Sequence, residues 1–543
     1  MTTNILSIGQ SALAAAQVGL ATTGHNIANS GTAGYSRQIV TQGAVAGQNS
    51  GYGFVGKGTE VTDVRRVHSE FLSGQVLAAQ IVSSSLDAYY TQIKRIDNLL
   101  ADPSAGVSPA LQDFFNSVQN LAAQPTDAAS RQAMLSSAES LTARFNGLDG
   151  QLADIRTGIN DQIESSVSAI NGYARQIAQL NDAIEKATTA AQGKPPNDLM
   201  DQRDQLIAQL GQEVRVTVVN QGNSSNVFIG NGQPLVVGSK AFALAATNSP
   251  TDSHRTVVAY VSKDKTSVLS ETALPGGRLG GLFEFRAKTL DPAQNALGRI
   301  ALAVGSTVNA QHRQGLTLNG SAGADLFTLP SPQVSASRDN QGTALVSAAI
   351  ADTSQLTTSD YRLQYDGSQY HLTRLSDEQT FTYASLPQTV DGFTFDVSGA
   401  PATSDTFVIR PTVAGAEGIR VALNDPAAIA ASANPGGKGD ARNIAAIADL
   451  QTALTLDGGS THFQGAYAAL VSEVGNKTRE LEVTSAAAGT YLNQAHQAQQ
   501  SESGVNLDEE AGNLMRYQQA YQAAGKLMQA AGQLFDILLE LGH

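Results

Sequence analysis

The side chains that most often carry out catalysis or bind metals are scattered along this sequence. The chain contains no cysteine, which removes thiolate chemistry, disulfides and cysteine-based zinc sites. No two of its eight histidines stand three to five residues apart, so no helix would present a histidine pair to a metal. The sequence has no GxSxG nucleophile elbow and no P-loop. It therefore predicts a protein that is not an enzyme and that has no catalytic residue, no metal site and no cofactor.

Two further motifs have a simpler explanation than ligand binding. Residues 51–56 have the GxGxxG spacing of a dinucleotide-binding loop, but residues 60–64, which follow, are strand-like rather than helical. The acidic run at residues 508–510 follows Asn506, a good helix cap, and the helix dipole favours negative charge at this position. The first motif predicts a glycine-rich loop, and the second predicts the start of a helix rather than a calcium site.

Charge and hydropathy exclude two classes of partner. The net charge is −14, from 34 basic and 48 acidic residues, and no run of Lys or Arg exceeds two. A nucleic-acid-binding protein needs a basic stripe, so we predict no nucleic-acid partner. The longest unbroken apolar stretches, such as residues 12–16, are short, and we predict no membrane insertion. The first basic residue is Arg37, so we also expect no cleavable signal peptide.

Both ends of the chain carry a seven-residue repeat that is typical of paired helices. All 16 prolines lie between Pro103 and Pro435, so the ends lack the strongest helix breaker. Near the start the repeat is formed by Leu6, Leu13, Leu20 and Ile27, with Gly9, Ala16 and Thr23 three positions on. Near the end it is formed by Leu507, Leu514, Tyr521, Met528 and Phe535, with Tyr517, Ala524, Ala531 and Leu538 three positions on. The repeats predict that the two ends form coiled-coil helices and that these residues make an assembly interface.

Neither end is expected to be stable alone. The first 36 residues contain no Lys, Arg, Asp or Glu, whereas an exposed helix normally carries charge on its outer face. Burying the four large N-terminal repeat residues is worth roughly 6–12 kcal/mol. Ordering the backbone costs on the order of 1–2 kcal/mol per residue over about 25 residues. We predict that the ends are mobile in the isolated chain and ordered in an assembly; the alternative is an unstructured low-complexity tail.

Between the ends the pattern changes twice, which predicts a nested, multidomain α + β protein. Its parts are paired N- and C-terminal coiled-coil helices, a helical rod-like domain and inserted β-rich outer domains. The terminal coiled-coil domain takes residues 1–36 with 505–543, and the helical rod takes 37–210 with 276–325 and 436–504. Residues 211–275 form a β-rich segment with a tight turn at Asn231–Gly232, and residues 326–435 form an outer β-rich domain.

The segment after the first repeat identifies a family. Residues 25–38 read His-Asn-Ile-Ala-Asn-Ser-Gly-Thr-Ala-Gly-Tyr-Ser-Arg-Gln, which resembles the N-terminal signature of bacterial flagellar axial proteins. The signature turn is predicted to consist of Asn26, Asn29, Thr32, Gly34, Tyr35 and Arg37; Ala33 stands where the family usually has proline. Residues 197–204, 227–235, 280–286, 503–510 and 517–521 also resemble the flagellar hook-associated protein 1 family. The resemblance covers both ends and the middle, and it is weakest between residues 335 and 430.

This resemblance implies a structural subunit of the junction between the flagellar hook and filament. Such a protein would be exported through the flagellar type III apparatus without a cleavable signal and would be located outside the cell. Its implied partners are copies of itself, the hook protein, a second junction protein and an export chaperone at the C-terminal helix. The alternatives are another axial protein of the hook or rod type, and a surface-exposed binding or adhesion protein.

Overall fold

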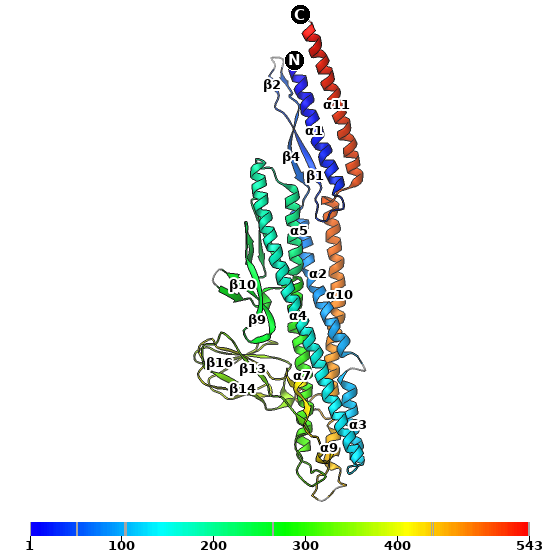
Figure 1. The fold of residues 1–543 in the computed structure, drawn as a ribbon, viewed down its shortest axis with the longest axis vertical. Coiled ribbons are helices and arrows are strands. Elements are labelled where there is room, and N and C mark those ends of the chain that lie inside the picture. Colours follow the sequence, from blue (N-terminus) through cyan, green and yellow to red (C-terminus); the bar gives the residue numbers. More distant parts are fainter. Residues whose placement is uncertain are drawn as a thin grey trace.

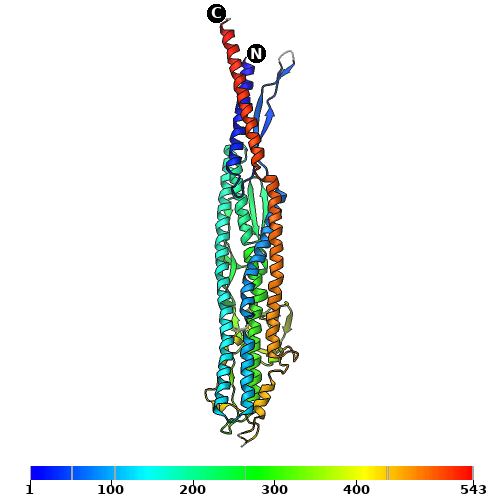
Figure 2. The ribbon, with the colours of Figure 1, turned by 90° about the vertical axis from the view of Figure 1, so that its right-hand side faces the viewer.

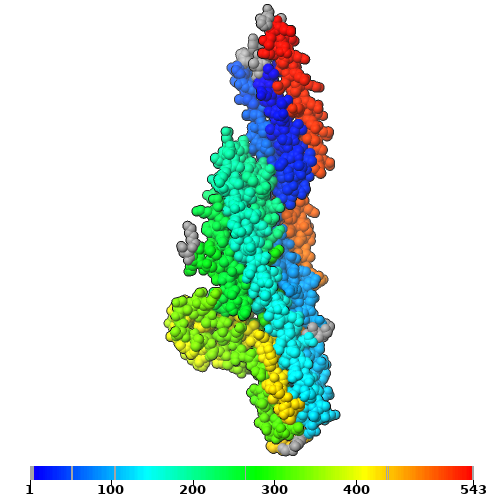
Figure 3. All heavy atoms as spheres, viewed as in Figure 1, coloured from blue at the N-terminus to red at the C-terminus, as the bar shows by residue number. Residues whose placement is uncertain are grey.

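The molecule is long and narrow, with both chain ends at one end of its long axis (Figures 1 and 2). The computed structural model describes residues 2–49, 53–102, 106–262, 265–435, 437 and 439–540; the side chains of residues 2–4 and 538 lie outside this description. Gly51 and Tyr52 of the glycine-rich motif therefore lie outside the described residues. Two β regions project from one side of a helical shaft (Figure 3). This is the multidomain α + β arrangement that the sequence predicts.

The terminal part consists of two long helices and a β-hairpin. Helix α1 (Thr2–Ala28) lies between helix α11 (Leu507–Glu540) and the hairpin (Figures 1 and 2). In the hairpin, β1 (Gln38–Ala44) pairs with β4 (Thr59–Arg66), and the short β2 (Gln48–Asn49) pairs with β3 (Phe54–Val55). The predicted domain boundary at residue 36 is too early, because this hairpin packs on α1 and is not part of a helical rod. Its strand pattern is hard to recognise because glycines interrupt it.

The shaft is a bundle of helices that run along the long axis. Its helices are α2 (Glu70–Leu100), α3 (Val107–Ala123), α4 (Ala128–Ala190), α5 (Asn197–Glu213), α6 (Gly277–Phe285), α7 (Asp291–His312), α9 (Arg442–Asp449) and α10 (Phe463–Ser503), with a π-helical turn at Arg286–Leu290. α2 packs against α10 and α6, and α4 packs against α3 and α5. The 63 residues of α4 give a continuous helix of roughly 95 Å.

Local sequence explains where α4 begins and which face it buries. The Asp127 carboxylate caps its first turn by accepting hydrogen bonds from the backbone N–H and hydroxyl of Ser130. From there, apolar residues recur every three or four positions, including Leu141, Phe145 and Leu148, and all three are buried. They belong to one core that continues into the first β region. The shaft is thus one packed body.

The first β region contains two small antiparallel sheets beside the shaft. One has the order β5–β6–β7–β8, formed by Val216–Gln221, Ser224–Ile229, Gln233–Val237 and Lys240–Ala241. The other has the order β11–β10–β9, formed by Lys265–Val268, Asp252–Ser262 and Ala243–Ser249. The predicted turn at Asn231–Gly232 is confirmed, since it joins the antiparallel β6 and β7 and Gly232 has a positive φ of 102°.

The outer β domain is built from two sheets with a shared core. The first sheet has the order β13–β20–β15–β16–β17, formed by Gln333–Ala336, Thr406–Arg410, Tyr361–Tyr365, Tyr370–Arg374 and Thr380–Tyr383. The second has the order β14–β19–β18, formed by Leu345–Ile350, Phe393–Ser398 and Gln388–Val390. Tyr361 of the first sheet contacts Phe393 of the second, with ring centroids 4.8 Å apart. At the base of the domain, β12 (Phe327–Thr328) pairs with β21 (Arg420–Val421), next to the one-turn helix α8 (Gly415–Gly418).

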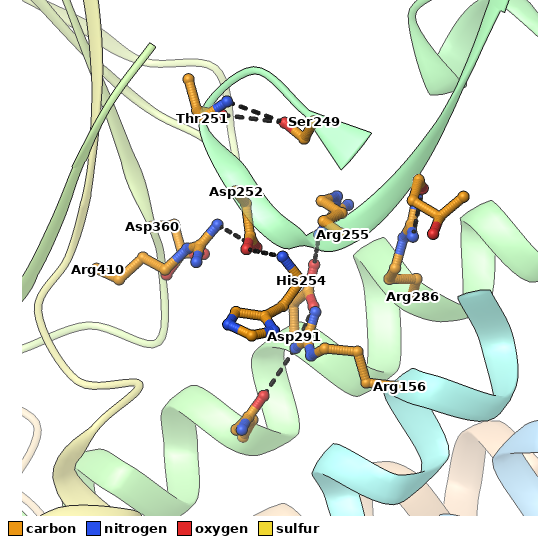
Figure 4. A network of polar contacts seen from close by, with 12 residues as sticks. Arg156, Ser249, Thr251, Asp252, His254, Arg255, Arg286, Asp291, Asp360 and Arg410 are labelled. Atoms are coloured by element: carbon orange, nitrogen blue, oxygen red, sulfur yellow. Dashed lines mark hydrogen bonds and ion pairs between the residues drawn. The ribbon is translucent and has the colours of Figure 1, made fainter. Parts of the chain in front are cut away.

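A network of ion pairs joins the shaft to both β regions (Figure 4). Asp291, at the start of α7, accepts from Arg156 of α4 at 2.8 Å and from Arg255 of β10 at 2.7 Å. Burial alone would raise the pKa of Asp291, but Arg255 and Arg156 outweigh burial and hold it well below its ordinary value. Arg410 of β20 pairs with Asp252 of β10 at 2.7 Å, which fastens the outer domain to the first β region.

Candidate assembly interface

The contact between α1 and α11 is made by small residues that bring the two helices close together. A Cβ atom added at Gly19 would lie 2.5 Å from the ring of Tyr517, and one added at Gly9 would lie 2.7 Å from Cγ of Met528. Ala16 and Thr23 of α1 are buried, as are Ala524 and Ala531 of α11. The glycines of α1 leave room for large side chains of α11, so the two helices pack closely.

The predicted seam residues do not all lie in this contact. On α11, Leu514, Tyr517 and Met528 are partly buried, and two of them cover the glycines of α1. Leu507, Tyr521 and Phe535 are 53%, 37% and 44% exposed, so this pairing leaves them largely uncovered. The side chain of Leu538 lies outside the described residues. On α1, the half-buried repeat residues are Leu6, Leu13, Leu20 and Ile27, whereas the buried positions are those of Gly9, Ala16 and Thr23.

The signature turn is held together by one asparagine side chain. Asn26, near the end of α1, is buried. Its side-chain amide hydrogen-bonds to both backbone groups of Gln38 in β1, as a neighbouring strand would. Its Nδ2 donates to the Gln38 carbonyl at 2.8 Å, and its Oδ1 accepts from the Gln38 N–H at 2.9 Å and from the Tyr35 hydroxyl at 2.7 Å. Burial, with the nearby Asp198, raises the pKa of Tyr35, so this hydroxyl keeps its proton and remains a donor. Asn26 thereby fixes where the hairpin leaves α1.

The other signature residues end the helix and reverse the chain. Asn29 donates from Nδ2 to the carbonyl of His25 at 3.0 Å, and Thr32 donates from its backbone N–H to the Asn29 carbonyl at 2.9 Å. Gly34 has a φ of +80°, where a side chain would be strained, and an added Cβ would meet Gln205 of α5 at 2.8 Å. Because Gly34 has no side chain, the turn can pack directly against α5.

Arg37 connects the turn to the C-terminal helix. Its guanidinium pairs with Glu509 at 2.7 Å and with Glu510 at 2.8 Å, and its backbone N–H donates to the Ser503 carbonyl at 2.9 Å. Glu510 is only 1% exposed. Sequence reasoning treats the acidic run only as a helix start and misses this pairing. The pairing could have been suspected because Arg37 ends the uncharged stretch and Glu510 lies in the first turn of the partner helix.

A second ion cluster fixes the turn to the shaft. Asp201 of α5 accepts from the Ser36 N–H at 2.9 Å and from Arg66 of β4 at 2.8 Å, and Arg66 also pairs with Asp204 at 2.7 Å. Burial raises the pKa of Asp201, whereas the Ser36 and Arg66 hydrogen bonds lower it. Gln38 also donates to Asp198 at 2.7 Å. Sequence reasoning misses the roles of Arg66, Asp201 and Asp204, because each depends on a contact between distant segments.

A hollow lies beside this cluster, between α1, β4 and the beginning of α5. Its volume is about 670 Å³, and it is lined by Val18, Gln38, Val61, Thr62, Asp63, Val64, Lys194, Pro195, Pro196, Asn197, Asp198 and Leu199. Among the described residues, no group of three or more His, Asp or Glu side chains could hold a metal ion.

One described helix is long and apolar enough to cross a membrane, by length and composition only: Ile5–Ala28. Ser, Thr, Gly and Gln interrupt this segment, so it contains no long unbroken apolar run. In the structure this segment contacts α11 and the hairpin. The absence of membrane insertion stays a prediction.

Comparison with known proteins supports one family. Residues 93–327 match the helical domain of flagellar hook-associated protein FlgK, and residues 334–411 match the D2-like domain of flagellar hook-associated protein 1. Residues 496–541 match the C-terminal region described as flagellar basal body rod FlgEFG protein. Residues 335–411, which lie in the region where the resemblance is weakest, are thus also matched by a domain of this family.

Whole-chain relatives agree with these domains. Flagellar hook-associated protein 1 of Escherichia coli (strain K12) is 40% identical over 544 residues, which cover 99% of this chain and 100% of the relative. The protein of that name from Salmonella typhimurium is 39% identical over 551 residues, with 99% and 100% coverage. The solved structure of the flagellar hook junction protein FlgK from Burkholderia pseudomallei superposes with a TM-score of 0.75 at 29% identity, covering 79% of this chain and 100% of that one. The chain belongs to the flagellar hook-associated protein 1 family.

Proposed function

We propose that this protein is a structural subunit of the junction between the flagellar hook and filament, and that it joins the assembly through its terminal helices. The hook-junction role follows from the family and from its relative of known structure. The role of the terminal helices rests on one observation: α11 remains apolar on faces that α1 does not cover. These exposed residues are Leu507, Met515, Tyr521, Leu527, Leu534, Phe535, Ile537 and Leu539, each between 37% and 60% exposed.

Tyr521 and Leu527 flank the α1 contact on its two sides, whereas Met515 lies on the opposite face of α11. At 100° per residue, Tyr521 and Leu527 lie about 60° to either side of Ala524, which faces α1. A lone helix pair in water would carry polar residues at these positions. An apolar flank on each side fits a helix that has further neighbours in the assembly.

Covering the exposed apolar residues of α11 in the assembly contributes free energy toward ordering the ends. Full burial of a large apolar side chain is worth about 1.5–3 kcal/mol, so covering the exposed half of each of eight side chains is worth roughly 6–12 kcal/mol per subunit. The estimate is an upper value, because the unfolded ends already bury part of this surface. It is large compared with the stability expected of an isolated helix pair.

Several finer features belong to the same proposal. The partners are copies of this chain, the hook protein and a second junction protein, and an export chaperone covers α11 before assembly. The protein is exported through the type III apparatus without a cleavable signal, is located outside the cell and has no enzymatic activity. The absence of cysteine fits export of an unfolded chain, which a disulfide would obstruct.

The proposal is tested by adding charge to the flanks of α11. In Tyr521→Asp with Phe535→Asp, two carboxylates replace exposed apolar groups, so the single chain keeps its fold but loses its contacts with neighbours. We expect cells with hooks but without filaments, which release filament protein into the medium. The matched control is Gln522→Asp with Gln529→Asp, which places the same charges at exposed polar positions of the same helix. Normal swimming of the Tyr521/Phe535 variant would refute the role of these residues.

A further inference from the structure

The most exposed large apolar side chain of the terminal part is Phe54. It lies in β3, at the end of the hairpin furthest from the shaft, and is 80% exposed; its neighbour Val55 is 44% exposed. An aromatic residue at the end of a projecting hairpin exposes about the largest apolar area that one side chain can offer. Nothing in the described part of this chain covers it.

Whereas Phe54 projects from the surface, the hollow between α1, β4 and α5 is a recess. Val18, Val61, Val64 and Leu199 give it apolar walls, and its volume of about 670 Å³ is within the range of sites that hold a ligand-sized group. Inside the described part of the chain, Oδ1 of Asp63 is buried at this place without a hydrogen-bond partner. A buried acceptor of this kind costs on the order of 1–3 kcal/mol until a donor reaches it.

Phe54 cannot fill the hollow of its own chain. The hollow is lined by residues 61–64, at the other end of the same hairpin. Seven to ten residues of extended chain separate them from Phe54, which is about 23–33 Å at roughly 3.3 Å per residue. The ladder between β1 and β4 keeps the hairpin extended and prevents it from folding back.

The charges of the two surfaces are complementary. Lys57 is the only charged residue between Arg37 and Glu60, so the end of the hairpin carries one positive charge. The hollow carries Asp63 and Asp198, against the single positive charge of Lys194, whose ammonium donates to the Thr62 carbonyl. A hairpin end from another copy would bring a cation to a site with excess negative charge.

We propose that Phe54 and Val55 of one copy enter the hollow of the next copy. The inference rests on the proposed function, because it needs copies of this chain to lie side by side in the junction. The contact uses two different surfaces of the same chain, so each copy can give its hairpin to one neighbour and receive a hairpin from another. Such a contact forms a ring or a helical series and does not stop at a dimer.

Engineered cysteines test this contact cleanly, because the chain has none of its own. In Val55→Cys with Leu199→Cys, Phe54 is kept, and a disulfide can form only if the hairpin of one copy reaches the hollow of another. In flagella isolated from cells that carry this variant, mild oxidation should give a ladder of covalent dimers, trimers and larger products. Val55→Cys with Leu345→Cys, whose second site is exposed on the outer domain, should give no ladder. Assembled junctions that yield no ladder, or only dimers, would overturn the inference.

A second variant covers the case in which the double-cysteine chain does not assemble. Phe54→Ser removes only an exposed side chain, so the chain should fold normally. We expect its junctions to lose filaments under mechanical shear more readily than Ser354→Ala, a control change in the outer domain. Unchanged filament retention would overturn the inference. The proposed function fails separately, if cells that lack the chain still attach filaments.

Discussion

The contact between Gly19 and Tyr517 gives a sharp prediction, because a second glycine of the same helix serves as its control. In Gly19→Ala, the new Cβ would lie 2.5–2.7 Å from three ring atoms of Tyr517. In Gly24→Ala, the new Cβ would meet nothing within 4 Å. Both changes replace glycine by the best helix former, which favours the helix by about 0.8–1.0 kcal/mol. Only the first also overpacks the helix contact.

The structure gives the sign and size of the difference. Overpacking of this kind costs typically 1–3 kcal/mol, because the ring must move or the helices must separate. In Gly24→Ala, the α1–α11 helix pair should therefore be more stable than in the parent by about 1 kcal/mol. In Gly19→Ala, the stability of this helix pair should be lower than in Gly24→Ala by roughly 1–3 kcal/mol. This difference corresponds to about a 5- to 150-fold change in the opening equilibrium.

Amide hydrogen exchange measures this equilibrium locally. In the purified chain, backbone amides of α11 around Tyr517 should exchange more slowly in Gly24→Ala than in Gly19→Ala. Adding Tyr517→Ala should remove the difference, because the ring that the new Cβ meets is then absent. Equal protection in the two single variants, with Tyr517 present, would refute the close approach of α1 and α11.

Three further predictions concern other parts of the molecule. Asn26→Ala leaves the backbone of Gln38 without its two partners, so we expect the hairpin to lose about 2–4 kcal/mol of local stability, measured as faster exchange of β1 amides. Amides of α1 and α11 in the purified parent chain should exchange faster than those of α4; equal protection would show that the ends are stable without neighbours. Burial lowers the pKa of His312, so the unfolded chain binds more protons below about pH 6.5, and the free energy of unfolding should fall as the pH drops through that range. This slope should be smaller in His312→Gln, as urea unfolding at pH 8 and pH 5 would report.

The terminal helices and their pairing could be predicted from the sequence, but the face through which each helix contacts the other could not. A seven-residue repeat predicts helices and a seam, and the structure has helices at both ends. The repeat contains two stripes, one of large residues and one of small ones, and nothing local decides which stripe faces the partner. Here Gly9, Ala16 and Thr23 are buried, because close packing of the backbones needs small residues. The large residues on the flanks remain for other contacts.

The partners in the ion pairs of the turn could not be assigned from the sequence alone, for a different reason. Arg37 meets Glu510, and Arg66 meets Asp201, across very large separations in the chain. Charge pairing has no periodicity, so these partners can be assigned only when the fold has brought the segments together. By contrast, the roles of Asn29 and Gly34 in ending the helix follow from local backbone preferences, and the structure has the predicted turn at this position.

Helices α1 and α11 pack against each other, so this terminal pair forms only in a chain that carries both helices. Every other element lies between α1 and α11, and the antiparallel packing of α2 with α10 brings Ser503 next to Arg37. The folded shaft thus holds α11 near α1 at a high effective concentration. Folding of the shaft has already brought the two ends of the chain together, so pairing of the helices costs little further loop-closure entropy. A chain cut anywhere before Leu507 retains α1 but has no helix to lay against Gly9 and Gly19. Such a shortened chain would therefore lack the paired end and the apolar face of α11 that the proposed assembly uses.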